Sequence, residues 1–80
     1  MAWDKFLQHE FIAVWSRLPS DEKRIITQEM EALSVDPPNY HPTPVRLMNG
    51  DFLIAALRYW IQYRLDTQNR RIIFIRLRTD

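Results

Sequence analysis

The side chains with the most chemical potential lie toward the end of the chain, where arginines are interspersed with aromatic residues. Candidate residues for binding a nucleic acid or a protein partner are Arg58, Trp60, Arg64, Phe74, Arg76 and Arg78. Arginine forms paired hydrogen bonds with phosphates and carboxylates, and it stacks on aromatic rings. Such a combination is typical of protein hot spots and of platforms for single-stranded nucleic acid. The alternative is a partly solvated sheet face on which arginine stems cover the aromatic rings.

Metal-free cleavage of RNA is one reaction that such a surface could support. It needs a group that deprotonates a 2′-hydroxyl, a group that protonates the leaving oxygen, and cations that stabilise the charged intermediate. The candidates for proton transfer are Tyr59, Tyr63, His9, His41 and several carboxylates. We expect His9 to lie on a helix surface and His41 to be structural, in a proline-rich loop. The two tyrosines are expected to anchor the core with their hydroxyl groups at its rim.

The composition argues against metal and cofactor sites. The chain has no cysteine, and its two histidines and scattered carboxylates lack any recognised ligand spacing. A glycine-rich phosphate loop is excluded because the chain contains one glycine. We therefore expect no metal and no cofactor.

The net charge of +1 conceals an asymmetry between the two halves of the chain. Residues 1–40 carry four basic and seven acidic side chains, whereas residues 41–80 carry seven arginines and three aspartates. This split indicates a C-terminal half that binds a partner. The first residues lack the apolar core of a signal peptide, and no apolar stretch is long enough to cross a bilayer. We expect a soluble cytoplasmic protein without membrane contact, folded as a single domain over residues 1–80.

The first half predicts two helices joined by a very short connection. Apolar residues recur at spacings of three and four from Trp3 through Phe11 and Trp15 to Leu18, and Pro19 ends this segment. Ser20 is placed to cap a second helix, which ends before Pro37. Residues 36–44 contain four of the five prolines and are interpreted as a stiff crossover, with a polyproline recognition site as the alternative.

The second half predicts strands, and its centre is an antiparallel hairpin from Tyr59 to Arg78. Asn49-Gly50 is the strongest turn signal in the chain. Residues 52–57 are compatible with a helix, but we favour a strand, which requires a tight turn near Leu57 and Arg58 without a glycine. The fold class is therefore α+β, with an N-terminal αα-hairpin packed on one face of a small antiparallel sheet of three to four strands.

Strict alternation along the hairpin predicts which residues each face carries. The face toward the helices would carry Tyr59, Ile61, Tyr63, Ile73, Ile75 and Leu77. The opposite face would show Trp60, Ile72 and Phe74 among Arg64, Arg76 and Arg78.

The order of these features resembles the RelE/ParE superfamily of toxins from bacterial toxin–antitoxin systems. The resemblance covers roughly Phe11 to Arg78, and its most specific part is the segment Tyr59-Trp60-Ile61-Gln62-Tyr63-Arg64-Leu65-Asp66. It implies a toxin-like module of a type II system that inhibits translation or gyrase and is neutralised by an antitoxin. As an enzyme it would be a metal-independent, ribosome-dependent mRNA endonuclease. Tyr63 would then be the acid–base residue, and Arg64, with the other candidate arginines, would bind RNA phosphates.

Several positions depart from the family pattern. The family's first strand has no expected counterpart before the first helix. Trp60 stands where the family typically has an arginine, and Leu53, Ile54 and Ala55 stand where active nucleases place basic residues. These departures favour the fold and a ParE-like action over nuclease chemistry. The alternative function is a non-catalytic protein-interaction domain that retains the RelE/ParE fold.

Overall fold

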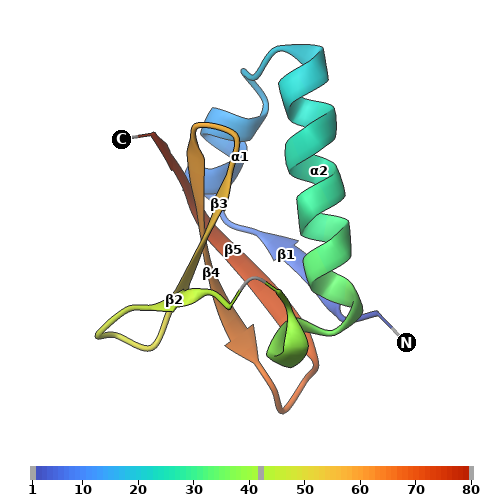
Figure 1. Cartoon of the computed structure of the whole chain (residues 1–80), viewed down its shortest axis with the longest axis vertical. Helices are drawn as coiled ribbons and strands as arrows, with labels where there is room; N and C mark the ends of the chain where they lie inside the picture. Colours follow the sequence, from blue (N-terminus) through green and yellow to red (C-terminus); the bar gives the residue numbers. More distant parts are fainter. Residues whose placement is uncertain (1, 42, 80) are drawn as a thin grey trace.

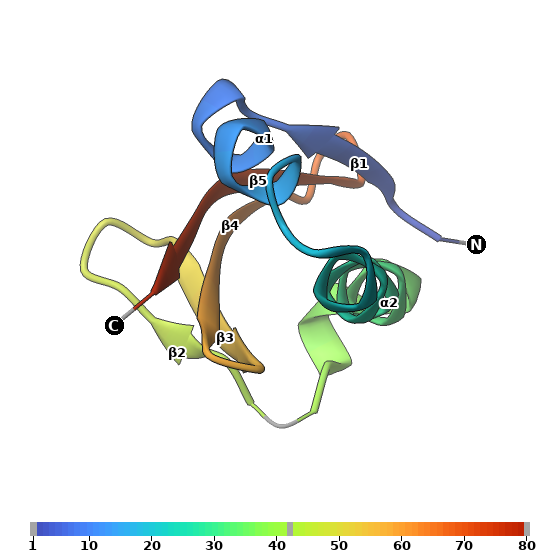
Figure 2. The same cartoon turned by 90° about the horizontal axis from the view of Figure 1, so that it is seen from above.

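Five strands form one mixed sheet, and two helices cover one of its faces (Figures 1 and 2). This computed structural model describes residues 2–41 and 43–79. The elements in chain order are β1 (Asp4–Leu7), α1 (His9–Trp15), α2 (Ser20–Val35), a 3₁₀ turn (Pro37–Asn39), β2 (Val45–Arg46), β3 (Phe52–Ala56), β4 (Tyr59–Asp66) and β5 (Arg71–Thr79). The spatial order is β1-β5-β4-β3-β2, and β1 runs parallel to β5 while the other neighbours are antiparallel. The α+β class is confirmed, but the expected purely antiparallel sheet of three to four strands is wrong.

The first element is a strand, although the helical spacing of the first apolar residues predicted a helix there. Residues Asp4 to Leu7 pair with Arg71 to Phe74 of β5. Lys5 and Leu7 are partly buried while Asp4 and Phe6 are exposed, which is the two-residue period of a strand. Pairing with a distant strand decides the conformation of this short segment, so the expectation that the chain enters its first helix almost at once is wrong. The first helix is correspondingly reduced to seven residues.

The core lies between the helices and the inner face of the sheet. Phe11 of α1 and Ile26, Met30 and Leu33 of α2 are buried, as the helical periodicity predicted. They meet inner-face residues that include Ile61 and Phe74 in one continuous cluster. Trp3 belongs to the same core, and Trp15 packs at its edge, where its indole Nε1 donates a hydrogen bond to Thr27 at 3.2 Å. No helix within the described part of the chain is long and apolar enough to span a membrane.

The predicted hairpin from Tyr59 to Arg78 is confirmed, but its two strands are not in simple alternation. Gln62 pairs with Arg76, whereas the next residue, Tyr63, pairs with Phe74, so Ile75 is an extra residue in β5. Such a β-bulge reverses the facing of every residue beyond it. Phe74 is therefore fully buried on the inner face, and its predicted place on the exposed face is wrong. Ile72 is likewise buried in the core rather than exposed.

The strand predicted for residues 52–57 is confirmed over Phe52–Ala56, and the turn after it has an unusual backbone. Leu57 has φ 57°, in the left-handed region that disfavours side chains with a Cβ atom. Its side chain is half exposed. The turn therefore adopts a conformation that glycine would accept more easily, as Gly50 does at φ 92° in the preceding turn.

Replacing Leu57 with glycine is expected to raise the free energy of unfolding by about 0.5–1 kcal/mol, because relief of the left-handed strain exceeds the added entropy of the unfolded chain. Urea denaturation followed by circular dichroism measures the change. Leu57→Ala is the matched control, since it removes the same side chain but keeps the strained backbone. If the glycine variant is no more stable than the alanine variant, the positive φ of Leu57 is not a source of strain.

Candidate functional site

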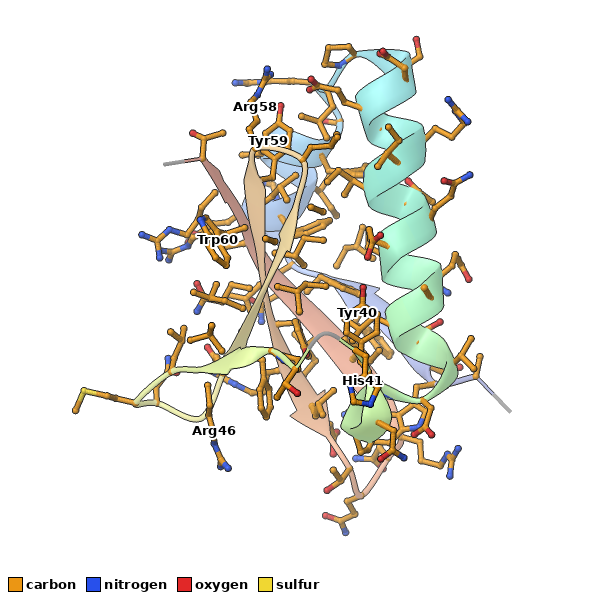
Figure 3. All side chains as sticks on the ribbon, viewed as in Figure 1. Tyr40, His41, Arg46, Arg58, Tyr59 and Trp60 are labelled. Atoms are coloured by element: carbon orange, nitrogen blue, oxygen red, sulfur yellow. The ribbon has the colours of Figure 1, made fainter. Side chains whose placement is uncertain are left out.

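The face of the sheet opposite the helices carries the side chains that the sequence marked for binding. Trp60 of β4 pairs with Arg78 of β5 on one side and with Ala55 of β3 on the other. In the next row of outward-facing residues, Gln62 lies between Arg76 of β5 and Leu53 of β3. Figure 3 shows Trp60 on the side of the sheet away from α2. We call the surface of Leu53, Ala55, Trp60, Gln62, Arg64, Arg76 and Arg78 the outer face.

The buried carboxylate of Asp51 binds two side chains of the outer face, and it was not predicted as a functional residue from the sequence. Asp51 is 1% exposed, and its side chain accepts hydrogen bonds from Arg64 Nε at 2.7 Å and Gln62 Nε2 at 3.0 Å. Asn49 Nδ2 donates a further bond at 3.1 Å. The hydrogen bond from Arg64 holds the pKa of Asp51 below its usual range, assisted by Gln62 and against the effect of burial. The carboxylate is therefore kept ionised, and it fixes the guanidinium of Arg64.

Two other candidate arginines are also bound to carboxylates. Arg76 Nε lies 3.1 Å from Glu10 Oε2, which extends from α1. Arg58 projects from the turn at the end of the sheet, and its Nη2 lies 3.2 Å from Glu22 Oε1. No ion pair involves Arg78 among the residues that the structure describes, and its side chain is exposed. The outer face is thus less cationic than its arginine content indicates.

The two tyrosines of the hairpin lie on the helix side of the sheet. Tyr63 is 1% exposed, stacks on Phe52 with ring centroids 5.5 Å apart, and contacts Phe74. Burial raises the pKa of Tyr63, which keeps its hydroxyl protonated. Tyr63 and Arg64 therefore point to opposite faces and are not brought together in one site. Tyr59 donates a hydrogen bond of 2.7 Å to Glu22, and this bond raises the pKa of Tyr59.

A cleft of about 390 Å³ lies along the edge of β3, between the outer face and the segment that follows α2. Its lining residues are Glu29, Tyr40, His41, Thr43, Pro44, Val45, Leu53, Ile54, Ala55 and Trp60. The Tyr40 hydroxyl donates a hydrogen bond to Glu29, and burial together with this bond raises the pKa of Tyr40 to about 12. Figure 3 shows Tyr40 and His41 beside the end of α2, with Trp60 on the far side of β3 and β4. His41 is exposed at this cleft, and His9 is exposed at the start of α1.

This arrangement of side chains on the outer face suits the binding of a partner better than acid–base catalysis. Trp60, Leu53 and Ala55 supply apolar surface, and arginines border it. The hairpin tyrosines, which are among the proton-transfer candidates, lie on the other side of the sheet. Within residues 2–41 and 43–79, no group of three histidine, aspartate or glutamate side chains is placed to hold a metal ion.

The structure is similar to solved structures of RelE toxins. It superposes on a chain of the RelBE2 toxin–antitoxin complex from Mycobacterium tuberculosis with a TM-score of 0.81 and 16% identity, covering 100% of this chain and 93% of that one. For the intact RelBE complex of E. coli the TM-score is 0.81 at 16% identity, covering 99% and 98%. For the isolated E. coli RelE toxin the TM-score is 0.79 at 15% identity, covering 98% and 84%.

The similarity is found by comparing structures and not by comparing sequences. No protein-family model matches the chain, and no curated protein matches it significantly. The similarity therefore lies in the arrangement of the elements over nearly the whole chain. It includes strand β1, which was not predicted from the sequence. The chain has the fold of the RelE toxins.

Proposed function

We propose that this chain is a cytoplasmic toxin-like module of a type II toxin–antitoxin system, forming a single domain and held inactive by an antitoxin. The support is the fold, which it shares with RelE toxins, two of them solved in complexes described as toxin–antitoxin assemblies. Low sequence identity leaves the activity to be argued from the site. The proposal therefore depends on the outer face.

We further propose that the module acts by binding a target rather than by cutting RNA. The observation that carries this is the separation of Tyr63 from the outer face: the best acid–base candidate is buried against Phe52 on the helix side. Arg64 and Arg76, offered for phosphate binding, are bound to Asp51 and Glu10. A non-catalytic block of a protein target such as gyrase needs only an apolar and arginine-bordered surface, centred here on Trp60 and Arg78.

Induced expression in a bacterial host tests this proposal, with separate readouts for growth, mRNA ends on ribosomes, and plasmid supercoiling. We expect growth arrest without new mRNA ends, and impaired supercoiling if gyrase is the target. Ribosome-dependent mRNA cleavage would contradict the non-catalytic mechanism. A well-folded product that causes no arrest would contradict the toxin function and favour the protein-interaction domain.

Arg78→Ala is expected to weaken the arrest at least tenfold in the inducer concentration required, because Arg78 is an exposed cation beside Trp60 at the centre of the proposed surface. Arg24→Ala is the matched control: it removes an exposed arginine from α2 and is expected to leave the arrest unchanged. Equal effects of the two substitutions would mean that the outer face is not the target-binding surface.

A further inference from the structure

Asn49 and Gly50 lie in the turn between β2 and β3, and this pair of residues is chemically labile. The backbone nitrogen of a glycine can attack the side-chain carbonyl carbon of an asparagine that precedes it, because glycine has no side chain to shield that nitrogen. The turn projects from the sheet (Figures 1 and 2), and Asn49 is exposed to water. Among the described residues, no atom outside 49–51 lies within 4 Å of the position that a Cβ atom of Gly50 would occupy. No neighbouring element therefore hinders the attack.

The folded turn holds both reacting groups in other interactions. The N–H of Gly50, whose nitrogen is the nucleophile, donates a hydrogen bond to the carbonyl of Leu47 at 3.0 Å. The side-chain amide of Asn49 is bound at both ends by Asp51. Its Nδ2 donates to Asp51 Oδ2 at 3.1 Å, and its Oδ1 accepts from the Asp51 N–H at 3.0 Å. The reaction therefore requires these hydrogen bonds to break in a local opening of the turn.

The product of this reaction does not fit the hydrogen bonds that surround Asp51. The buried, ionised carboxylate of Asp51 accepts hydrogen bonds from Asn49, Gln62 and Arg64. Deamidation replaces the Asn49 donor with a second carboxylate at the same place. Two carboxylates that share a site cannot both remain ionised without a large cost, so either one takes up a proton or the two separate. Either change disturbs the contact that fixes Arg64 on the outer face.

We propose that Asn49 is a site of spontaneous deamidation that the hydrogen bonds of Asp51 keep slow, and that its conversion is an irreversible change of the outer face. The Gly50 nitrogen loses its proton to water and forms a bond to Asn49 Cγ, while the Cγ–Nδ2 bond breaks and the amide leaves as ammonia. Water then opens the succinimide ring and leaves aspartate or isoaspartate at position 49. This chemistry concerns the turn alone, so the proposal does not depend on the proposed function.

Mass spectrometry of the tryptic peptide 47–58 measures the rate of deamidation after the folded chain has been incubated at mildly alkaline pH. Each rate is divided into that of the same peptide incubated in isolation, and the ratio is the protection that the fold supplies. We expect protection of about tenfold or more in the wild-type chain and the loss of most of it in Asp51→Ala. Glu10→Ala is the matched control, because it removes a carboxylate from another arginine of the outer face and leaves the turn intact.

The wild-type chain in urea, at a concentration that matches the stability of Asp51→Ala, controls for destabilisation in general. It is expected to keep most of its protection, because the hydrogen bonds of Asp51 remain. Equal loss of protection in urea and in Asp51→Ala would overturn the proposal. A wild-type chain that deamidates as fast as the isolated peptide would also overturn it.

A second measurement tests the product and does not depend on the rate. Asn49→Asp introduces the second carboxylate, and Asn49→Ala removes the same hydrogen bonds without adding a charge. At neutral pH the equilibrium constant for unfolding of Asn49→Asp is expected to exceed that of Asn49→Ala about tenfold. The difference is expected to shrink in acid, where one carboxylate of the pair is protonated. Equal stability of the two variants at neutral pH, or a difference that does not change with pH, would show that a carboxylate fits at position 49 and would overturn the proposal.

Discussion

Replacing Phe74 with alanine is expected to lower the free energy of unfolding by about 4 kcal/mol. The ring is fully buried, and its centroid lies 5.5 Å from that of Phe11 and 6.4 Å from that of Tyr63. It therefore joins α1 to the two central strands, and its removal leaves a cavity between them. A domain of this size has a total stability on the order of 4–12 kcal/mol, so the variant is expected to be largely unfolded near 37 °C. Urea denaturation measures the loss.

Phe6→Ala is the control for that experiment. Phe6 lies on β1 opposite Ile73, the residue before Phe74, but its side chain is 48% exposed. We expect it to cost about 1 kcal/mol or less. A Phe74 variant that unfolds no more easily than the Phe6 variant would show that Phe74 is not in the core. The outer-face assignment that alternation predicted would then be correct, and the β-bulge would be wrong.

Asp51→Ala is expected to lower the free energy of unfolding by about 2–3 kcal/mol, because it leaves Gln62 and Arg64 without their shared acceptor. The loss is moderated by the exposure of Arg64, which can be rehydrated. Glu10→Ala removes an exposed carboxylate from Arg76 on the same face and is expected to change stability by about 0.5 kcal/mol or less. If the two variants are equally stable, the Asp51 cluster does not hold the turn against β4.

The same carboxylate predicts a dependence of stability on pH. The pKa of Asp51 is lower in the folded chain than in the unfolded chain, where it is about 4. Its stabilisation is therefore complete above about pH 4 and is lost as the pH falls through the folded pKa. Asp51→Asn is expected to flatten the acid limb of the stability curve. An acid limb identical to that of the wild-type chain would contradict this assignment.

Local signals in the sequence predicted the elements well, and long-range pairing accounts for the differences. The periodicity of α2 and the Asn49-Gly50 turn required no distant partner, and both are present. Strand β1 has four residues and becomes a strand through β5, which lies far along the chain. The bulge at Ile75 carries no glycine or proline that would mark it. For this reason Phe74 was assigned to the wrong face.

Asp51 could have been found from the hairpin register. The turn predicted at Leu57 and Arg58 pairs Phe52 with Tyr63, and the preceding residue, Asp51, then falls beside Arg64. An aspartate opposite an arginine on one sheet face is an expected ion pair. Its burial was not predictable, because it depends on how the side chains of Asn49, Gln62 and Arg64 close around it. The cleft was beyond prediction for a similar reason, since it depends on where the segment after α2 lies relative to β3.

The pairing of β1 with β5 also sets the order in which the molecule can be made. Strand β5 lies between β1 and β4, and it supplies Ile72, Phe74 and Leu77 to the core. During synthesis the first strand emerges from the ribosome long before its neighbour, so the sheet cannot close until residue 79 is free. Until then the nascent chain exposes the surfaces that β5 will cover, and it has no assembled outer face. The outer face, which we propose as the target-binding surface, can therefore form only after β5 has emerged from the ribosome.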